Sequence, residues 1–156
     1  RALKDYRMKE SNICEISRML SAKPEESAQA VKRLQDEAKS WREKLIQTQS
    51  RAMEQILENL PEHVENYLVF KKDVDKNVAR RFVDEGKSKC QGICGIFLGN
   101  DEDGYRYILG SESVDLKAFS KTFHETLGGK GGGKGEMMQG TVNASEETIR
   151  NYIEKK

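Results

Sequence analysis

Hydrophobic residues recur at helical spacing through the first 60 residues of the chain. Positions three or four apart share one face of a helix, and five residues of the first segment do so: Leu3, Tyr6, Ile13, Ile16 and Leu20. Pro24, followed by two acidic residues, is typical of the start of a second helix, which we expect to end near Asn59, before Pro61. The pattern predicts an antiparallel, coiled-coil-like helical hairpin over residues 1–62.

The second predicted helix carries a hydrophobic seam that alternates by three and four positions, as in a coiled coil. The seam consists of Val31, Leu34, Ala38, Trp41 and Leu45, and the pattern then shifts to Met53, Ile56, Leu57 and Leu60. At about 1.5 Å per residue the second helix would be roughly 54 Å long and the first roughly 30 Å, so the overhang needs a partner. That partner is either the following domain or a second copy of the chain. In a homodimer we expect contacts from Val31, Leu34, Trp41, Leu45, Met53 and Ile56. The alternative is a hairpin within one chain that has a solvated outer face.

Shorter segments of changing period follow from residue 66. Strands are predicted at Tyr67–Phe70, Gly92–Gly99, Tyr105–Gly110 and Met137–Val142, and helices at Val74–Glu85, Leu116–Leu127 and from Asn143 or Ser145 to Ile153. Gly86 would end the first of these helices, and residues 100–104 would form the turn of a hairpin. The order β-α-β-β-α-β-α predicts an α+β protein, in which the helical hairpin precedes a small α/β sandwich over residues 63–156.

A run of glycines separates the last two predicted helices. Seven of the thirteen residues from Gly128 to Gly140 are glycine, and two more are Lys130 and Lys134. We interpret the run as an ordered loop, because a flexible linker would carry serine and would not lead directly into Met-Met-Gln. Successive N–H groups in such a loop can form a concavity for an anion, to which the lysines would add charge. The alternative is architectural: the backbone packs closely on the sheet and the lysines are merely solvated.

Composition narrows the class of protein. The chain has 156 residues, of which 36% are hydrophobic and 34% charged, and its 27 basic and 26 acidic residues give a net charge of +1. No global field therefore attracts it to nucleic acid, and any such binding must come from a local patch. Three cysteines (Cys14, Cys90, Cys94) fit reduced thiols in a cytoplasmic protein, and no apolar run approaches a membrane span. The chain opens without methionine, so we expect it to begin partway through a larger polypeptide.

The residues that would support catalysis are sparse. His63 and His124 lie far apart in the sequence, and Cys90 and Cys94 lack the further ligands that zinc requires, so we expect the two cysteines to fill the core. His124 either lines a cavity of the glycine loop or lies on the surface. The loop departs from a Walker A motif because glycine, rather than serine or threonine, follows Lys134. The sequence predicts no catalytic activity for this segment itself.

The glycine run, together with its flanks, resembles the DHH-associated (DHHA) domain that closes alanyl-tRNA synthetases and the longer alanyl-tRNA editing (AlaX-type) proteins. The family pattern is a helix ending in leucine or valine, Gly-Gly-x-Gly-Gly-Gly, a basic residue, a variable pair, a small apolar pair, Gln and Gly. The matching positions are Leu127, Gly128, Gly129, Gly131, Gly132, Gly133, Lys134, Met137, Met138, Gln139 and Gly140. The opening residues 1–6 are similar to the segment that follows the editing domain in AlaX-type proteins.

The resemblance implies a non-catalytic C-terminal region that contributes tRNA binding, with tRNA-Ala as the expected partner, and homodimerisation. A zinc-dependent deacylase or a synthetase domain would then lie before Arg1, and this segment would need no cofactor of its own. The implied RNA-binding residues are Gly128, Gly129, Lys130, Gly131, Gly132, Gly133, Lys134, Gln139 and Gly140. Two alternatives stay open: a purely structural dimerisation module, and the nucleotide-binding half of a DHH phosphoesterase. The second usually carries a histidine in the glycine motif, where this chain has Lys134 and Gly135.

Overall fold

The computed structural model describes residues 2–61 and 64–155, and His63 lies outside them. The chain divides into two compact units, Arg1–Leu45 and Ile46–Lys156, and helix α2 (Ser27–Glu58) contributes residues to both. Within the described residues, every helix is too short or too polar to cross a bilayer.

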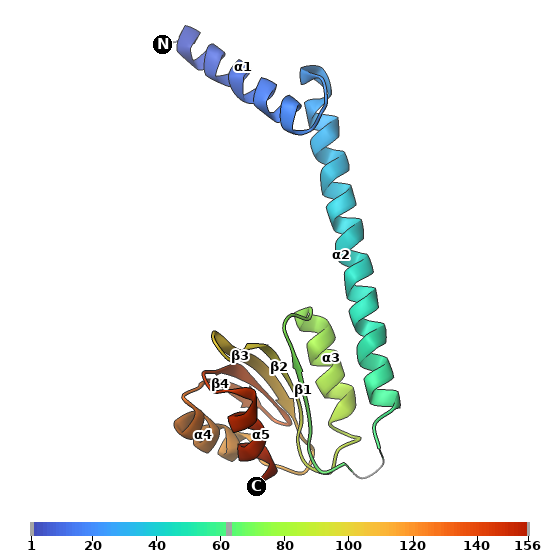
Figure 1. Ribbon diagram of the computed structural model, residues 1–156, viewed down its shortest axis with the longest axis vertical. Coiled ribbons are helices and arrows are strands. Elements are labelled where there is room, and N and C mark those ends of the chain that lie inside the picture. The colour runs from blue at the N-terminus through green and yellow to red at the C-terminus, as the bar shows by residue number, and fades with distance from the viewer. Residues whose placement is uncertain (1, 62–63, 156) are drawn as a thin grey trace. The chain divides into compact units, whose positions relative to one another are not determined.

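The first unit is helical. It contains α1 (Ala2–Met19), a short 3₁₀ turn η1 (Pro24–Glu26) and the first half of α2 (Figure 1). Hydroxyl groups hold the turn between the helices: the Ser27 Oγ donates to the main-chain oxygen of Pro24 at 2.6 Å and lies 2.9 Å from the Ser17 Oγ. Ser21 takes a positive φ of 50° there. The two helices that the periodicity predicts are therefore present, and Pro24 begins the turn that precedes the second.

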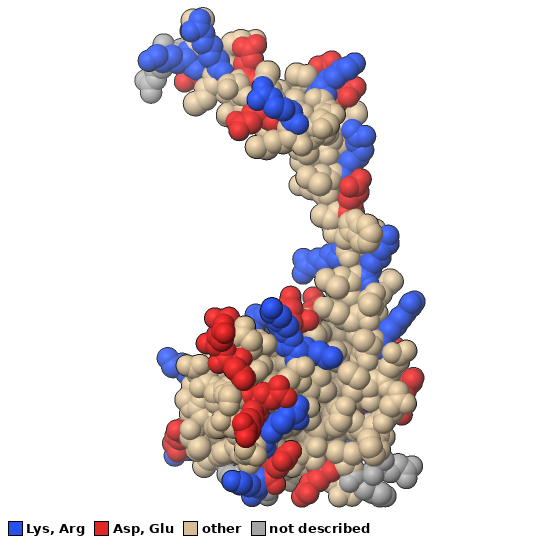
Figure 2. Space-filling view, in the orientation of Figure 1, with Lys and Arg blue, Asp and Glu red and all other residues tan. Residues whose placement is uncertain are grey.

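The apolar interface expected between these helices is not formed along their length. Contact is confined to the turn, where Ser17 and Ala30 are buried. Trp41 remains 68% exposed, and the other seam residues are exposed as well: Leu3, Tyr6, Ile13, Ile16, Val31, Leu34 and Leu45. Along this unit, charges of both signs are separated by uncharged surface (Figure 2). The seam is thus an uncovered apolar face in the single chain.

The second unit is a five-stranded mixed sheet with helices on both faces (Figure 1). Its elements are β1 (Tyr67–Lys71), α3 (Lys76–Gly86), β2 (Cys94–Asn100), β3 (Gly104–Gly110), α4 (Leu116–Leu127), β4 (Lys130–Lys134), β5 (Met137–Val142) and α5 (Glu146–Glu154). The strand order is β1-β2-β3-β5-β4. β1 runs parallel to β2, and the other neighbours are antiparallel. The α+β fold class is confirmed.

The predicted element order lacks one strand. Residues Lys130–Lys134 of the glycine run form β4, which pairs with β5 along its whole length. The observed order is therefore β-α-β-β-α-β-β-α, and the interpretation of residues 128–140 as a loop is wrong. Glycine has a low intrinsic preference for strands, so this strand arises from its pairing partner and not from its own composition.

Two hydrophobic clusters cover the two faces of the sheet. α4 and α5 pack on one face over a cluster that includes Phe97, Tyr107, Leu109, Phe123 and Ile149. α3 and the last turns of α2 pack on the other face over a cluster that includes Met53, Leu57, Phe82, Ile96 and Ile108. Alternation along the strands assigns side chains to these faces as expected for a sheet covered on both sides.

Several local expectations are confirmed and one is corrected. Ser145 caps α5 by accepting from the Thr148 N–H, and Cys90 and Cys94 are buried core residues. Gly86, however, does not terminate α3 with a left-handed cap. It is the last helical residue and Lys87 follows it with φ −60°. A Cβ at Gly86 would lie 2.5 Å from the Cys94 Sγ on β2 and 3.2 Å from the Leu57 Cδ2, so the glycine allows α3 to pack closely on the sheet.

Candidate nucleic-acid interface

β4 is an edge strand without side-chain cover. All five residues from Lys130 to Lys134 are exposed, and the strand lies at the end of the sheet beside β5. Peptide groups of an edge strand that do not pair with the neighbouring strand point outward from the sheet. Because three consecutive residues are glycines, these groups are not shielded by side chains. β4 therefore presents main-chain donors and acceptors between two ammonium groups.

Close backbone contact with β5 explains two glycines of β4. A Cβ at Gly131 would lie 2.7 Å from the Gly140 Cα, and a Cβ at Gly133 would lie 2.7 Å from the Met138 Cα. Both distances are too short for a real carbon pair, so any side chain there would force the strands apart. A Cβ at Gly132, in contrast, would meet no atom within 4 Å. Packing therefore requires glycine at positions 131 and 133, but it gives no reason for glycine at position 132.

A pair formed by the buried Tyr107 and the half-buried His124 lies beneath the start of β4. The Tyr107 hydroxyl is 2.5 Å from the His124 Nε2, and a Cβ at Gly131 or Gly140 would lie 2.9 or 2.8 Å from that hydroxyl oxygen. Gly129 packs against the ring of His124 in the same way, with its Cβ position 2.8 Å from the His124 Cδ2. His124 therefore faces the glycine strand from below instead of lining a loop cavity.

Burial shifts both members of this pair toward their neutral forms. Desolvation raises the pKa of Tyr107 to about 12, and it lowers the pKa of His124. A neutral imidazole and a neutral phenol share one hydrogen bond without placing a charge under β4. The support beneath the strand is thus rigid and uncharged at neutral pH.

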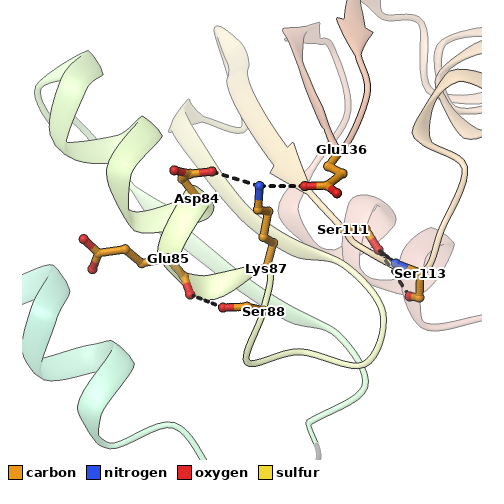
Figure 3. A network of polar contacts seen from close by, with 7 residues as sticks. All are labelled: Asp84, Glu85, Lys87, Ser88, Ser111, Ser113 and Glu136. Carbon is orange, nitrogen blue, oxygen red and sulfur yellow. Dashed lines mark hydrogen bonds and ion pairs between the residues drawn. The ribbon is translucent and has the colours of Figure 1, made fainter.

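The turn between β4 and β5 is tied to the end of α3 (Figure 3). The Lys87 Nζ lies 2.8 Å from the Glu136 Oε2 and 2.9 Å from the Asp84 Oδ1. These hydrogen bonds, to Glu136 first and Asp84 second, raise the pKa of Lys87. The Ser111 N–H also donates to the main-chain oxygen of Glu136 at 3.0 Å. Lys87 therefore partly offsets the charge of Glu136, the acidic residue nearest to Lys134 in sequence, and shares its own charge with Asp84.

The two lysines of β4 lie at opposite ends of the strand and line two different hollows. The Lys134 hollow has a volume of about 340 Å³ and is also lined by Arg80, Gly132 and Gln139. The Lys130 hollow has a volume of about 530 Å³ and is also lined by Lys72, Arg106 and Thr141. The single concavity expected from a glycine loop is therefore replaced by a strand with a cationic hollow at each end.

The residues predicted for dimerisation fall into a buried group and an exposed group. Met53 is 5% exposed and lies in the cluster beneath α3, and Ile56 packs against that cluster. These two residues serve the core of the second unit, because the following domain covers that part of the helix. Val31, Leu34, Trp41 and Leu45 remain exposed in the first unit.

Sequence reasoning missed three cations of these hollows. Lys72, Arg80 and Arg106 were not singled out as phosphate-binding residues. Their common position follows from strand register and from the packing of α3, which are long-range features. In the described part of the chain, no three His, Cys, Asp or Glu side chains gather in a way that could hold a metal ion.

The steric roles of the β4 glycines give a first testable prediction. We expect Gly131→Ala and Gly133→Ala each to lower the free energy of unfolding by about 1–3 kcal/mol, as for overpacking in a tight site. Gly132→Ala, the matched control one position away, should leave stability unchanged or raise it slightly, since alanine restricts the unfolded chain. Chemical denaturation of the three variants checks this; equal losses at all three positions would contradict the assignment.

The Tyr107–His124 pair predicts a pH dependence of stability. The pKa of His124 is lower in the folded chain, so the unfolded chain takes up a proton first as pH falls through about 6.5, and stability decreases below that pH. The pKa of Tyr107 is about 12 when folded, so the unfolded chain releases its proton first above about pH 10, and stability decreases there too.

Urea unfolding from pH 5 to pH 11 tests both signs. The acidic decrease should be smaller in His124→Gln and the alkaline decrease smaller in Tyr107→Phe. A difference between wild type and variant that stays constant with pH would show that the pair does not titrate in this way.

Comparisons with known proteins can now be set beside this geometry. Among solved structures, the C-Ala domain of alanyl-tRNA synthetase from Aquifex aeolicus resembles the chain with a TM-score of 0.47 and 20% sequence identity, over 60% of this chain and 94% of that one. The comparison with curated proteins gave no significant match. Residues 64–155 match the DHHA1 domain family, which is the family that the glycine string indicates. The match covers more than half of the sequence, and the chain belongs to the DHHA1 domain family.

Proposed function

We propose that this chain is the non-catalytic C-terminal region of an alanyl-tRNA editing or alanyl-tRNA synthetase-related protein, and that its second unit binds tRNA. Membership of the DHHA1 family and the extended glycine string support this assignment. The observation that carries the binding role is β4, an exposed edge strand with a lysine at each end and three glycines between them. Main-chain N–H groups and lysines are common donors to phosphate oxygens.

The proposed binding residues act in two ways. Lys130 and Lys134 contact phosphates directly, whereas Gly131, Gly133 and Gly140 allow the close strand pairing that fixes the two lysines. Gly128 and Gly129 join β4 to α4, and Gly128 takes the left-handed conformation, φ 66°, that ends the helix. Gln139, exposed on β5 opposite Gly132, offers an amide to a base or a ribose.

The net charge of +1 limits what this unit can do alone. A screened phosphate contact contributes on the order of 1 kcal/mol, so a few contacts give a weak docking site. The zinc-dependent deacylase, or a synthetase domain, is proposed to lie outside this segment and to supply the acceptor-end contacts. Linking the two sites would then raise the overall affinity through effective concentration.

Fluorescence anisotropy with labelled tRNA-Ala at low salt tests the binding role. We expect Lys130→Ala and Lys134→Ala each to weaken binding roughly fivefold, as on the order of 1 kcal/mol per contact implies. Lys117→Ala and Lys121→Ala are matched controls, because both lysines are exposed on α4, which packs on the opposite face of the sheet. If the β4 variants bind like wild type, these lysines do not contact RNA; if wild type does not bind, the function itself is refuted.

A second role, dimerisation through the first unit, is favoured by its exposed apolar face. Val31, Leu34, Trp41 and Leu45 are 37%, 55%, 68% and 56% exposed, and an a/d seam of this kind is buried in coiled coils. Lys44 lies over the Trp41 ring at 4.6 Å from its centroid and still leaves most of that ring uncovered. We propose that a second copy of the chain covers this seam.

Sedimentation velocity of the full chain tests dimerisation. We expect a dimer at micromolar concentration, and a monomer after Trp41→Glu together with Leu45→Glu, because charges in an apolar seam are not solvated in the dimer. Ser40→Glu, exposed on the far side of the same helix, should leave the dimer intact. A wild-type monomer throughout the accessible concentration range would refute the proposal.

A further inference from the structure

In the described part of the second unit, the β5–β4 part of one sheet face is exposed, and it forms an open half-face. Opposite residues of antiparallel neighbours point to the same face, so the pairings define rows across β3, β5 and β4: Arg106–Thr141–Lys130, Ile108–Gln139–Gly132 and Gly110–Met137–Lys134. Ile108 belongs to the cluster that α3 covers, which assigns all three rows to the α3 side. The β5 and β4 members of these rows are exposed apart from the half-buried Met137. α3 thus covers the β2–β3 part of the face and leaves the β5–β4 part open.

Cations surround this open half-face. Lys130, Arg106 and Lys72 line one hollow and Lys134 and Arg80 the other. Each of the five is exposed, and within residues 2–61 and 64–155 none of them forms an ion pair, whereas Arg81, Lys87 and Arg150 do. Asp103 is the acidic residue among those lining the two hollows, and its carboxylate accepts from the Asn100 side chain. The residues that line the two hollows comprise five cations and one anion, a net charge of +4, although the whole chain is nearly neutral.

The two hollows are too far apart for one small anion. Lys130 and Lys134 lie four residues apart along a strand, which corresponds to about 13 Å at 3.3–3.4 Å per residue. This exceeds the distance of about 8 Å over which exposed charges interact at physiological salt. A mononucleotide that occupies one hollow therefore gains little from the other, whereas a strand of RNA carries phosphates in both.

We propose that the open half-face binds the phosphodiester backbone of RNA, with one phosphate at Lys72, Arg106 and Lys130 and another at Arg80 and Lys134. The inference rests on the proposed function for the identity of the RNA and adds Lys72, Arg80 and Arg106 to the site. Gly132 lies between the two cation groups, and its lack of a side chain leaves room for the backbone to approach β4. Access for the RNA backbone would explain why position 132 is glycine, which packing against β5 does not. Binding of this kind positions RNA without reading its sequence.

A competition series tests the two-site geometry. Labelled tRNA-Ala bound to the full chain at low salt is displaced with AMP, with oligoadenylates of two to eight nucleotides, and with unlabelled tRNA-Ala. We expect AMP to compete poorly and competition to improve at least tenfold once the oligomer spans both hollows. Equal competition by AMP and the octamer would overturn the inference and favour a single nucleotide site.

Paired variants test whether the cations of each hollow contact RNA. We expect Arg106→Ala with Lys130→Ala, and separately Arg80→Ala with Lys134→Ala, each to reduce the slope of log affinity against log salt by about 0.7, because each pair removes the contact with one phosphate. Lys117→Ala with Lys121→Ala, on α4, should leave the slope unchanged. Gly132→Leu should weaken binding at least tenfold while the chain stays folded by circular dichroism, since the side chain enters the open face; Gly132→Ala, a smaller addition, should have less effect.

The outcomes separate this inference from the proposed function. If wild type binds tRNA-Ala but both paired variants and Gly132→Leu bind equally well, the RNA site is elsewhere on the chain and the half-face is refuted. If wild type has no affinity at low salt, the proposed function fails first. Loss of binding in one pair alone would refute the two-hollow arrangement.

Discussion

The close approach of the β4 and β5 backbones is the constraint on which the site depends. Gly131 and Gly140 face one another across the ladder above the Tyr107 hydroxyl. A side chain at either position would separate the strands and lift β4 from its support. Because the pair is held this closely, the lysines at both ends of β4 are fixed relative to the sheet. The exposed edge, the hollows and the open half-face all follow from this contact.

Local sequence patterns were sufficient to locate most elements. Helical periodicity placed α1 to α5, and short apolar runs placed β1, β2, β3 and β5, because the hydrophobic side chains of each element recur at the period of that element. β4 could not be found in this way, since glycines have no side chains to bury and carry no periodicity. Its strand conformation depends on hydrogen bonds to β5, across the turn at Gly135. The family resemblance identified the DHHA1 domain correctly, although the secondary structure of its glycine run was misread.

Long-range contacts account for the other differences between expectation and structure. Met53 and Trp41 look alike in a helical pattern, but Met53 is buried in the core of the second unit, whereas Trp41 is exposed within the first unit. Gly86 looks like a helix terminator, yet glycine is required there by the close approach of α3 to Cys94 on β2. Lys72 and Arg106 lie in separate segments, and sheet topology brings them to one hollow. Sequence alone identifies such residues as exposed cations, and register decides which of them act together.

The distribution of ion pairs explains how a chain with almost no net charge can still carry unpaired cations in one region. Arg81, Lys87 and Arg150 form ion pairs with acidic neighbours, and Lys87 partly offsets the charge of Glu136 next to β4. Without Lys87, the carboxylates of Asp84 and Glu136 would repel a phosphate near Lys134 more strongly. The ion pairs that anchor the turn to α3 therefore also reduce the negative charge at this end of β4. Because the same lysine contributes to both, the stability of the hairpin and its affinity for an anion should change together when Lys87 is altered.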